Sequence, residues 1–128
     1  KKYKIEDKYI SKISPLTTVL AFKQNVETKQ EIVVTDKSGN ILKENDFIGT
    51  NTKIKVGSLE YTLIVIGDTN GDTKADLQDI LQINKHRLNK TSLKGTGLIA
   101  GDVNQDGKVD LQDILQINKY RLGKISNL

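Results

Sequence analysis

The strongest constraint on the fold of this 128-residue chain is an internal duplication in its second half. The segment GDTNGDTKADLQDILQINKHRL at residues 67–88 aligns without gaps with GDVNQDGKVDLQDILQINKYRL at residues 101–122. Seventeen of the 22 positions are identical, and from Asp76 onward only His86 and Tyr120 differ. Surface positions normally tolerate substitution, so identity at polar positions needs a cause besides core packing. Two copies are too few for a solenoid, which favours two units related by a pseudo-two-fold axis.

Each copy begins with an acidic loop of twelve residues, Asp68–Asp79 or Asp102–Asp113. Positions 1, 3, 5 and 12 carry Asp, Asn, Asp and Asp, the spacing with which an EF-hand-like loop directs oxygen atoms at one centre. Position 7 adds a backbone carbonyl, and position 9 usually contributes through a water. The predicted ligands are Asp68, Asn70, Asp72, Lys74, Asp76 and Asp79 in the first loop and Asp102, Asn104, Asp106, Lys108, Asp110 and Asp113 in the second.

A ligand set made only of oxygen atoms suits a hard cation. A flexible shell of six to eight oxygens at about 2.3–2.6 Å favours Ca²⁺ over Mg²⁺, which demands tighter octahedral geometry. The carboxylates within one loop repel one another, and a divalent ion removes that cost, so metal binding and folding are expected to be coupled. We therefore predict two Ca²⁺ ions. The alternative, two solvated acidic turns, leaves unexplained why the spacing occurs twice with a helix behind it.

The two loops differ at position 6, where a sharp turn requires glycine. The second loop has Gly107 there, whereas the first has Thr73, a β-branched residue poorly suited to a positive φ. The sequence therefore predicts that the first site is the weaker or the more distorted of the two.

A predicted helix follows each loop, and its apolar residues fall on two stripes. Ile80 and Ile83 share one face, as do Ile114 and Ile117 in the second copy. The other stripe consists of Leu77, Leu81, Asn84, Lys85 and Leu88, and in the second copy of Leu111, Leu115, Asn118, Lys119 and Leu122. We expect one stripe to form a shared core while the other stays exposed as a binding surface. In the alternative, both stripes are core and residues 1–66 cover the second.

The pattern of residues 1–66 predicts a small β-rich module with one helix. Tyr3–Ile13 is expected to form one long or two short strands, and SPLTTVLAFKQNV a short helix capped by one of its threonines. Hairpins are expected around Lys37–Asn40 and around Gly57-Ser58, which gives the order β-α-β-β-β-β. The last strand runs into Gly67 without a flexible linker, which suggests a rigid junction.

Composition excludes several other functions. The absence of Cys excludes disulfides, thiolate metal sites and a Cys nucleophile, and the single His86 offers no second His for a zinc or iron site. The acids are committed to metal, so an enzyme is not expected. The net charge of +4 comes from scattered Lys and Arg without an aromatic stacking set, which argues against nucleic-acid binding. No apolar run approaches the ~20 residues of a membrane helix. A calmodulin-like sensor would need a helix before each loop, where YTLIVIGD predicts a strand.

The second half strongly resembles a dockerin, the duplicated calcium-binding module that attaches secreted proteins of anaerobic bacteria to cohesin modules. The resemblance covers about Gly67–Lys124 and includes the GD.N.D openings, Asp at position 12 and one helix per loop. Residues 1–66 are similar to the accessory modules, often called X modules, that precede dockerins, on the segment ISPLTTV…F and the direct fusion at IGD. The chain begins with Lys-Lys and lacks a signal peptide pattern, so we expect a fragment of a longer protein.

The resemblance implies a fold, a partner and a location. The implied fold class is α+β, with a β-rich module at residues 1–66 and an all-α dockerin fold at residues 67–128. It also implies two bound Ca²⁺, antiparallel helices in pseudo-two-fold symmetry, and a monomer that docks a cohesin at the cell surface or in a secreted, cellulosome-type assembly. The implied cohesin-facing residues are Leu77, Gln78, Leu81, Asn84 and Lys85, with Leu111, Gln112, Leu115, Asn118 and Lys119 as the second set. Leu-Gln stands where many dockerins carry Ser-Thr, which implies a more apolar contact.

Two functions are compatible with these patterns. In the first, the second half is a calcium-dependent module that docks a cohesin, in two orientations related by its symmetry. In the second, it is a calcium-stabilised spacer or terminal module of a surface protein with no cohesin partner. Identity between the exposed polar positions of the two copies favours docking, because rigidity alone would preserve only the loops and the core.

Overall fold

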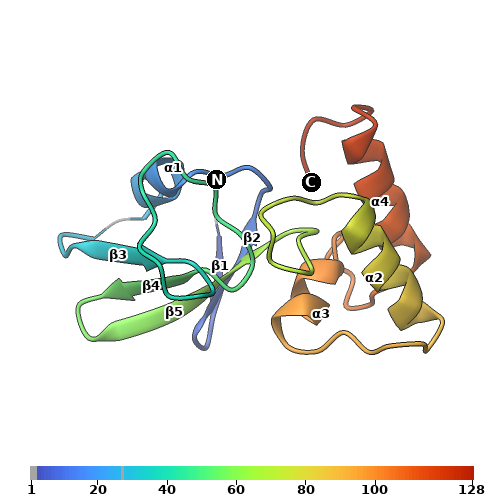
Figure 1. The fold of residues 1–128 in the computed structure, drawn as a ribbon, viewed down its shortest axis with the longest axis horizontal. Coiled ribbons are helices and arrows are strands. Elements are labelled where there is room, and N and C mark those ends of the chain that lie inside the picture. Colours follow the sequence, from blue (N-terminus) through green and yellow to red (C-terminus); the bar gives the residue numbers. More distant parts are fainter. Residues whose placement is uncertain (1–2, 27) are drawn as a thin grey trace.

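The computed structural model describes residues 3–26 and 28–128, which form a sheet half and a helical half (Figure 1). The strands are β1 (Lys4–Glu6), β2 (Tyr9–Ile13), β3 (Ile32–Thr35), β4 (Lys53–Val56) and β5 (Leu59–Val65), and the helices are α1 (Val19–Gln24), α2 (Leu77–Arg87), α3 (Thr96–Gly101) and α4 (Leu111–Arg121). In Figure 1 the C-terminus returns to lie between the two halves. Among the described residues, no helix has the length and hydrophobicity needed to span a membrane.

The sheet has the strand order β1-β2-β5-β4-β3 and is mixed. Strands β2 and β5 are parallel, whereas the other neighbouring pairs are antiparallel. The hairpin predicted around Gly57-Ser58 is confirmed, because Val56 pairs with Leu59 at its end. Strand β5 is therefore the centre of the sheet and also the strand that leads into the first loop.

Helix α1 covers one face of this sheet. Its N-cap residue determines where the helix begins, and its buried residues determine which side faces the sheet. The hydroxyl of Thr18 accepts a hydrogen bond from the N–H of Ala21 at 3.2 Å, which caps the helix at one of the two predicted threonines. Val19 and Phe22 are fully buried under the helix, and the ring of Tyr3 stacks on Phe22 with centroids 5.3 Å apart. Apolar side chains of the helix and of strands β2 to β5 thus form the core of the sheet half.

The predicted strand order of the sheet half is wrong, and the first predicted hairpin forms only in part. Tyr3–Ile13 forms two strands, one of the two predicted arrangements, with Asp7 at φ 54° between them. Among the described residues three strands follow α1 rather than four, so the observed order is β-β-α-β-β-β. Strand β3 pairs with β4, and the segment after the turn contacts β3 through an isolated bridge from Thr35 to Ile41 and a hydrogen bond from the N–H of Leu42 to the carbonyl of Val34 at 2.9 Å. The carboxylate of Asp36 accepts hydrogen bonds from two N–H groups of the turn, both at 2.9 Å. The turn is present as predicted, but the strand that pairs with β3 along its length is β4, which lies further along the chain.

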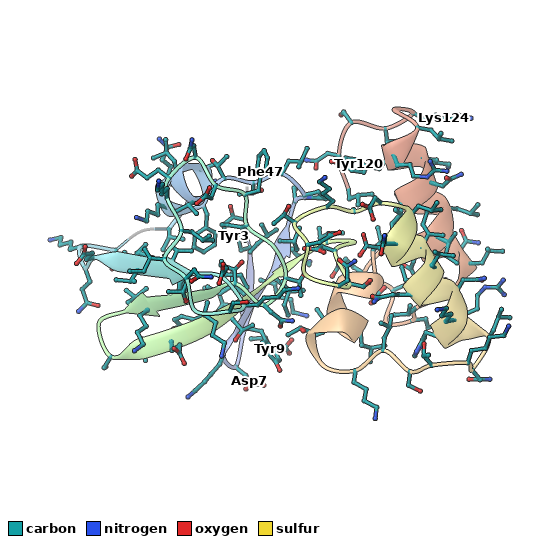
Figure 2. The ribbon with its side chains drawn as sticks, in the orientation of Figure 1. Tyr3, Asp7, Tyr9, Phe47, Tyr120 and Lys124 are labelled. Carbon is teal, nitrogen blue, oxygen red and sulfur yellow. The ribbon has the colours of Figure 1, made fainter. Side chains whose placement is uncertain are left out.

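The helical half is built around α2 and α4, which lie side by side and run in opposite directions (Figure 1). Ile83 and Ile117 are fully buried between them, with Ile80 and Ile114 partly buried beside them. Tyr120 projects from α4 toward the sheet half (Figure 2) and packs against the same core. The isoleucine stripe predicted from the sequence therefore forms the core shared by the two copies.

The fold class predicted from the sequence is wrong in its all-α part. In the described ranges, the chain folds into a five-stranded mixed sheet with four helices, and the helical half is built onto that sheet. The N–H of Gly67 donates to the carbonyl of Ala100 at 2.9 Å, and α3 packs against β5. The all-α expectation rested on local loop–helix patterns, which carry no information about such contacts between distant segments.

Candidate metal centres and docking face

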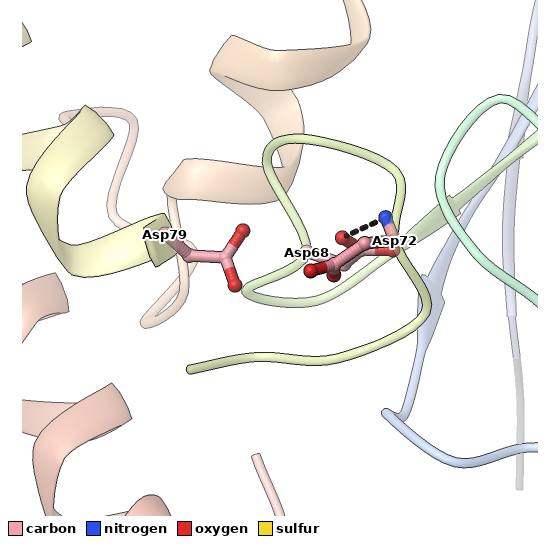
Figure 3. Close-up of side chains that lie close together, drawn as sticks. All are labelled: Asp68, Asp72 and Asp79. Carbon is pink, nitrogen blue, oxygen red and sulfur yellow. Dashed lines mark hydrogen bonds between the residues drawn. The ribbon is translucent and has the colours of Figure 1, made fainter. Parts of the chain in front are cut away.

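The first loop brings three carboxylates together (Figure 3). One oxygen each of Asp68, Asp72 and Asp79 lies within 4.8 Å of the other two, and Asp68 and Asp79 are fully buried. Asp68 lies three residues after the end of β5 at Val65, Asp72 lies in the loop, and Asp79 lies in the first turn of α2. The N–H of Asp72 donates to Asp68 at 3.1 Å, the bond drawn in Figure 3. Three of the six predicted ligands of the first loop thus converge on one centre.

The second loop repeats this arrangement, but its position-1 carboxylate is more exposed than that of the first loop. Oxygens of Asp102, Asp106 and Asp113 lie within 4.8 Å of one another, and Asp113 is fully buried while Asp106 is exposed. Asp102 is half-buried, in contrast to Asp68 at the same position of the first loop. The same three loop positions therefore converge in both copies.

The position-12 carboxylates are held by the start of the helices. Asp76 and Asp79 form a capping box, in which each side chain accepts a hydrogen bond from the backbone N–H of the other residue. The second oxygen of Asp79 accepts from the N–H of Thr69 at 2.9 Å and from its hydroxyl at 3.0 Å. Asp113 is fixed in the same way by its capping box with Asp110. Helix capping therefore orients the carboxylates toward the loop centre.

The other predicted ligands take part in the loops without joining the carboxylate triads. The side-chain oxygens of Asn70 and Asn104 accept from backbone N–H groups two residues later, at 3.2 and 3.3 Å. One oxygen of Asp76 and one of Asp110 accepts from a helix N–H, each at 3.1 Å. The side chains of Lys74 and Lys108 are exposed, and the prediction for these two residues concerned the backbone carbonyl. A role for these six residues in metal binding stays a prediction.

The electrostatics of the triads favour a cation. Burial, together with repulsion from a neighbouring carboxylate, raises the pKa of Asp79 to about 7 and that of Asp68 to about 6. Burial also raises the pKa of Asp113. Within residues 3–26 and 28–128 none of the six triad carboxylates forms a salt bridge that would neutralise it. Carboxylates that lack a salt-bridge partner and converge three to a loop fit Ca²⁺ by charge, and their oxygen atoms fit it by ligand type.

Both leucine stripes lie on the surface. We call Leu77, Gln78, Leu81, Asn84, Lys85 and Leu88 the first leucine face, and Leu111, Gln112, Leu115, Asn118, Lys119 and Leu122 the second leucine face. The six leucines are 45–54% exposed, and the glutamines and lysines are exposed as well. Asn84 and Asn118 are half-buried at the edge of the faces. The sheet half therefore covers neither face, contrary to the alternative in which both stripes are core.

Comparison with known families connects these features. Residues 66–122 match the family model of the dockerin type I domain. This segment is a dockerin domain. The match covers less than half of the chain, and residues 3–65 lie outside it. No curated protein and no solved structure matches the chain.

The dockerin assignment implies a general function for this segment. Dockerin domains are non-catalytic modules that bind calcium and dock onto cohesin modules. The two carboxylate triads are the groups of this domain that could hold the ions. The resemblance drawn from the GD.N.D openings and the repeated helices is thus confirmed for the dockerin part of the chain.

Sequence reasoning missed several residues that shape the first centre. Thr69 supports Asp79, and the N–H of Thr50 donates to Asp68 at 2.9 Å from outside the loop. The duplicated alignment does contain a signal for Thr69, because the second copy has Val103 at the same position and a valine side chain cannot donate. Thr50 lies in a segment that carries no repeat and no motif, so its role depends on the three-dimensional fold.

The raised pKa values predict how pH affects the metal-free protein. The folded state keeps protons on Asp68 and Asp79 that the unfolded state loses, so the stability they provide is present at low pH. It is lost as pH rises from about 4, the ordinary pKa, through about 7, the raised value. Melting in the absence of calcium should therefore show a higher Tm at pH 5 than at pH 7.5. A Tm that increases over this interval contradicts the prediction, and an Asp79→Asn variant should show a flatter dependence.

The loops are expected to bind calcium unequally. Thr73 adopts φ 77° in the first loop, a conformation that costs a β-branched residue roughly 1–2 kcal/mol. In the second loop Gly107 adopts φ 88° without that cost, although Gln105 also has a positive φ of 62°. Calcium titration of D72A, which leaves the second loop, should therefore give the tighter site, and D106A the weaker one. Tighter binding by D106A would contradict the prediction.

Proposed function

We propose that residues 67–128 attach this chain to a cohesin module through a surface ordered by two Ca²⁺, one in each loop. Residues 1–66 are the accessory module of this unit, and catalysis is not part of its role. Two separate hydrophobic clusters support the division near residue 66, one within residues 10–65 and one that begins at Ile66. The setting proposed for this attachment is extracellular, in a cellulosome-type or cell-surface assembly.

One observation carries the proposal: two faces of identical sequence are exposed behind two carboxylate triads. The first leucine of each face, Leu77 or Leu111, directly follows the N-cap residue of its helix, Asp76 or Asp110. Calcium would fix the loop and with it the start of the helix, because Asp79 belongs to both. Docking would then depend on calcium because the ion holds the face in place.

The proposed surface has the chemistry of a protein interface. Six exposed leucines supply an apolar centre, and glutamine, asparagine and lysine supply a polar rim. The partner would therefore present an apolar patch with hydrogen-bonding groups at its edge. We propose that the two faces serve as alternative contacts, so that the cohesin binds in either of two orientations related by the pseudo-two-fold axis.

A capture experiment against a set of cohesin modules tests this function. The intact chain should retain a cohesin in 1 mM calcium and release it when a chelator is added, because the faces lose their calcium-fixed supports. The double variant D72A/D106A should fail to bind at the same calcium concentration, while the variant L98A/I99A, altered at exposed residues of α3, should bind normally. Failure to retain any cohesin would favour the structural spacer, which needs calcium but no partner.

A further inference from the structure

The sheet half reaches directly into the first loop. The N–H of Thr50 donates to one carboxylate oxygen of Asp68 at 2.9 Å, and the N–H of Thr73 donates to the same oxygen at 3.0 Å. Thr50 is 1% exposed and Asp68 is fully buried, so water does not compete for this bond. This oxygen is therefore oriented by one donor from its own loop and one from outside the dockerin domain, while the other oxygen of Asp68 accepts from its own loop, from the N–H groups of Gly71 and Asp72 at 2.9 and 3.1 Å.

The outside segment approaches the loop so closely at Gly49 that a side chain there would meet the loop backbone. A Cβ atom on Gly49 would lie 3.0 Å from the backbone nitrogen of Thr73, and 3.1 Å from both the carboxylate of Asp68 and the carbonyl of Gly71. Contacts this short would force the segment or the loop to move by a few tenths of an ångström. A side chain at position 49 would therefore change either the position of residues 49–52 or the conformation of the first loop.

The donor is held rigidly. The hydroxyl of Thr50 accepts from the N–H of Val65 at 3.0 Å and donates to the carbonyl of Val65 at 3.3 Å. The N–H of Asn51 donates to the carbonyl of Leu63 at 2.9 Å. These bonds fix residues 49–52 to β5, the strand that enters the loop at its other side. The orientation of the carboxylate consequently depends on the folded sheet.

The second loop has a different environment. Asp102 accepts from the N–H groups of Asp106 and Gly107 at 3.1 and 2.8 Å, and both donors belong to its own loop. A pocket of ≈ 280 Å³ lies between this loop and β1–β2, lined by Tyr9 and Ser11 on one side. In the described part of the chain, the contact from residues 49–52 therefore has no counterpart at the second loop.

We propose that residues 49–52 are an outer shell of the first metal site, which makes calcium affinity at this site depend on the sheet half. The inference rests on the proposed binding of calcium by both loops. Outer-shell partners that orient a ligand typically change metal affinity by 10- to 100-fold. Because such coupling is reciprocal, calcium in the first loop stabilises the packing of residues 49–52, whereas calcium in the second loop does not.

Chains with one working loop separate the two sites. D106A retains the first loop and D72A the second, and each is combined with Gly49→Ala. Titration calorimetry with calcium should show that Gly49→Ala weakens binding about tenfold or more in the D106A chain. The same substitution should leave the affinity of the D72A chain unchanged. The control Thr50→Ser keeps the N–H and the hydroxyl and should preserve the affinity of the first loop.

Amide hydrogen exchange supplies a second readout that does not depend on how well the Gly49→Ala variant folds. Exchange of the Thr50 N–H should slow on calcium addition in the D106A chain and stay unchanged in the D72A chain. If both chains bind calcium but Thr50 responds alike in both, or Gly49→Ala weakens neither site selectively, the inference is overturned and the two-site proposal stands. If neither chain binds calcium, both are overturned.

Discussion

Truncation of one leucine face is expected to leave most of the affinity for cohesin intact, whereas truncation of both faces abolishes binding. The first variant is L77A/Q78A/L81A, and the second adds L111A/Q112A/L115A. If the two orientations are equivalent, loss of one halves the association constant, a change of about twofold. Loss of both removes the buried anchors of either orientation, and such residues each contribute about 2 kcal/mol or more.

The exposure of the two faces supports near-equivalence. Leu77 and Leu111 are 52% and 48% exposed, and Leu81 and Leu115 are 51% and 45% exposed. Each pair occupies the same position behind an identical capping box. A partner rotated by 180° would therefore meet the same side chains in the same local geometry.

Titration calorimetry with a purified cohesin measures the three affinities in saturating calcium. The triple variant of the second face alone, L111A/Q112A/L115A, is the matched control and should bind as well as the first triple variant. These side chains are exposed, so circular dichroism should show unchanged helix content in every variant. If the first triple change already removes binding, a single orientation is used and the symmetry of the two copies reflects only their common ancestry.

The convergence of the carboxylate triads could be predicted from the sequence because a twelve-residue loop is a local structure. The spacing of Asp68, Asp72 and Asp79 determines which carboxylates meet, and the structure brings these three together. The stripe of Ile83 and Ile117 was predictable for the same reason, since helical periodicity needs only neighbouring residues. Local spacing does not, however, report how deeply a loop is buried, and the burial of Asp68 came from a distant segment.

The arrangement of the sheet depends on pairing between distant strands. A hairpin was predicted at Lys37–Asn40 because the turn residues are strong, but β3 pairs with β4 across an intervening segment of irregular structure. The parallel pairing of β2 with β5 likewise has no local signal. Contact between Gly49 and the first loop follows from this pairing, since β5 brings the two segments together. The expectation of an all-α fold failed for the same reason, because contacts between distant segments leave no local signal in the sequence.

Removal of calcium is expected to unfold the helical half while the sheet half stays folded. A site stabilises the folded state by about 4 kcal/mol when free calcium exceeds the dissociation constant a thousandfold. Two such sites together approach the whole stability of a small domain, about 5–15 kcal/mol. Without the ions the triads keep their mutual repulsion, and the core that remains in the helical half is small, with Ile83 and Ile117 at its centre.

Hydrogen exchange with and without a chelator at pH 7.5 measures this difference along the chain. Amides of α2 and α4 should lose most of their protection on chelation, while those of β4 and β5 keep theirs, because the sheet half has its own core around Phe22 and Ile54. Protection at Thr50 should fall with the first loop, since its N–H bonds to Asp68. Equal loss of protection in both halves would mean that the chain unfolds as one unit and that calcium stabilises the sheet as strongly as the helices. Retention of protection in α2 and α4 after chelation would show that packing of the isoleucine core, rather than the metal, holds the helical half together.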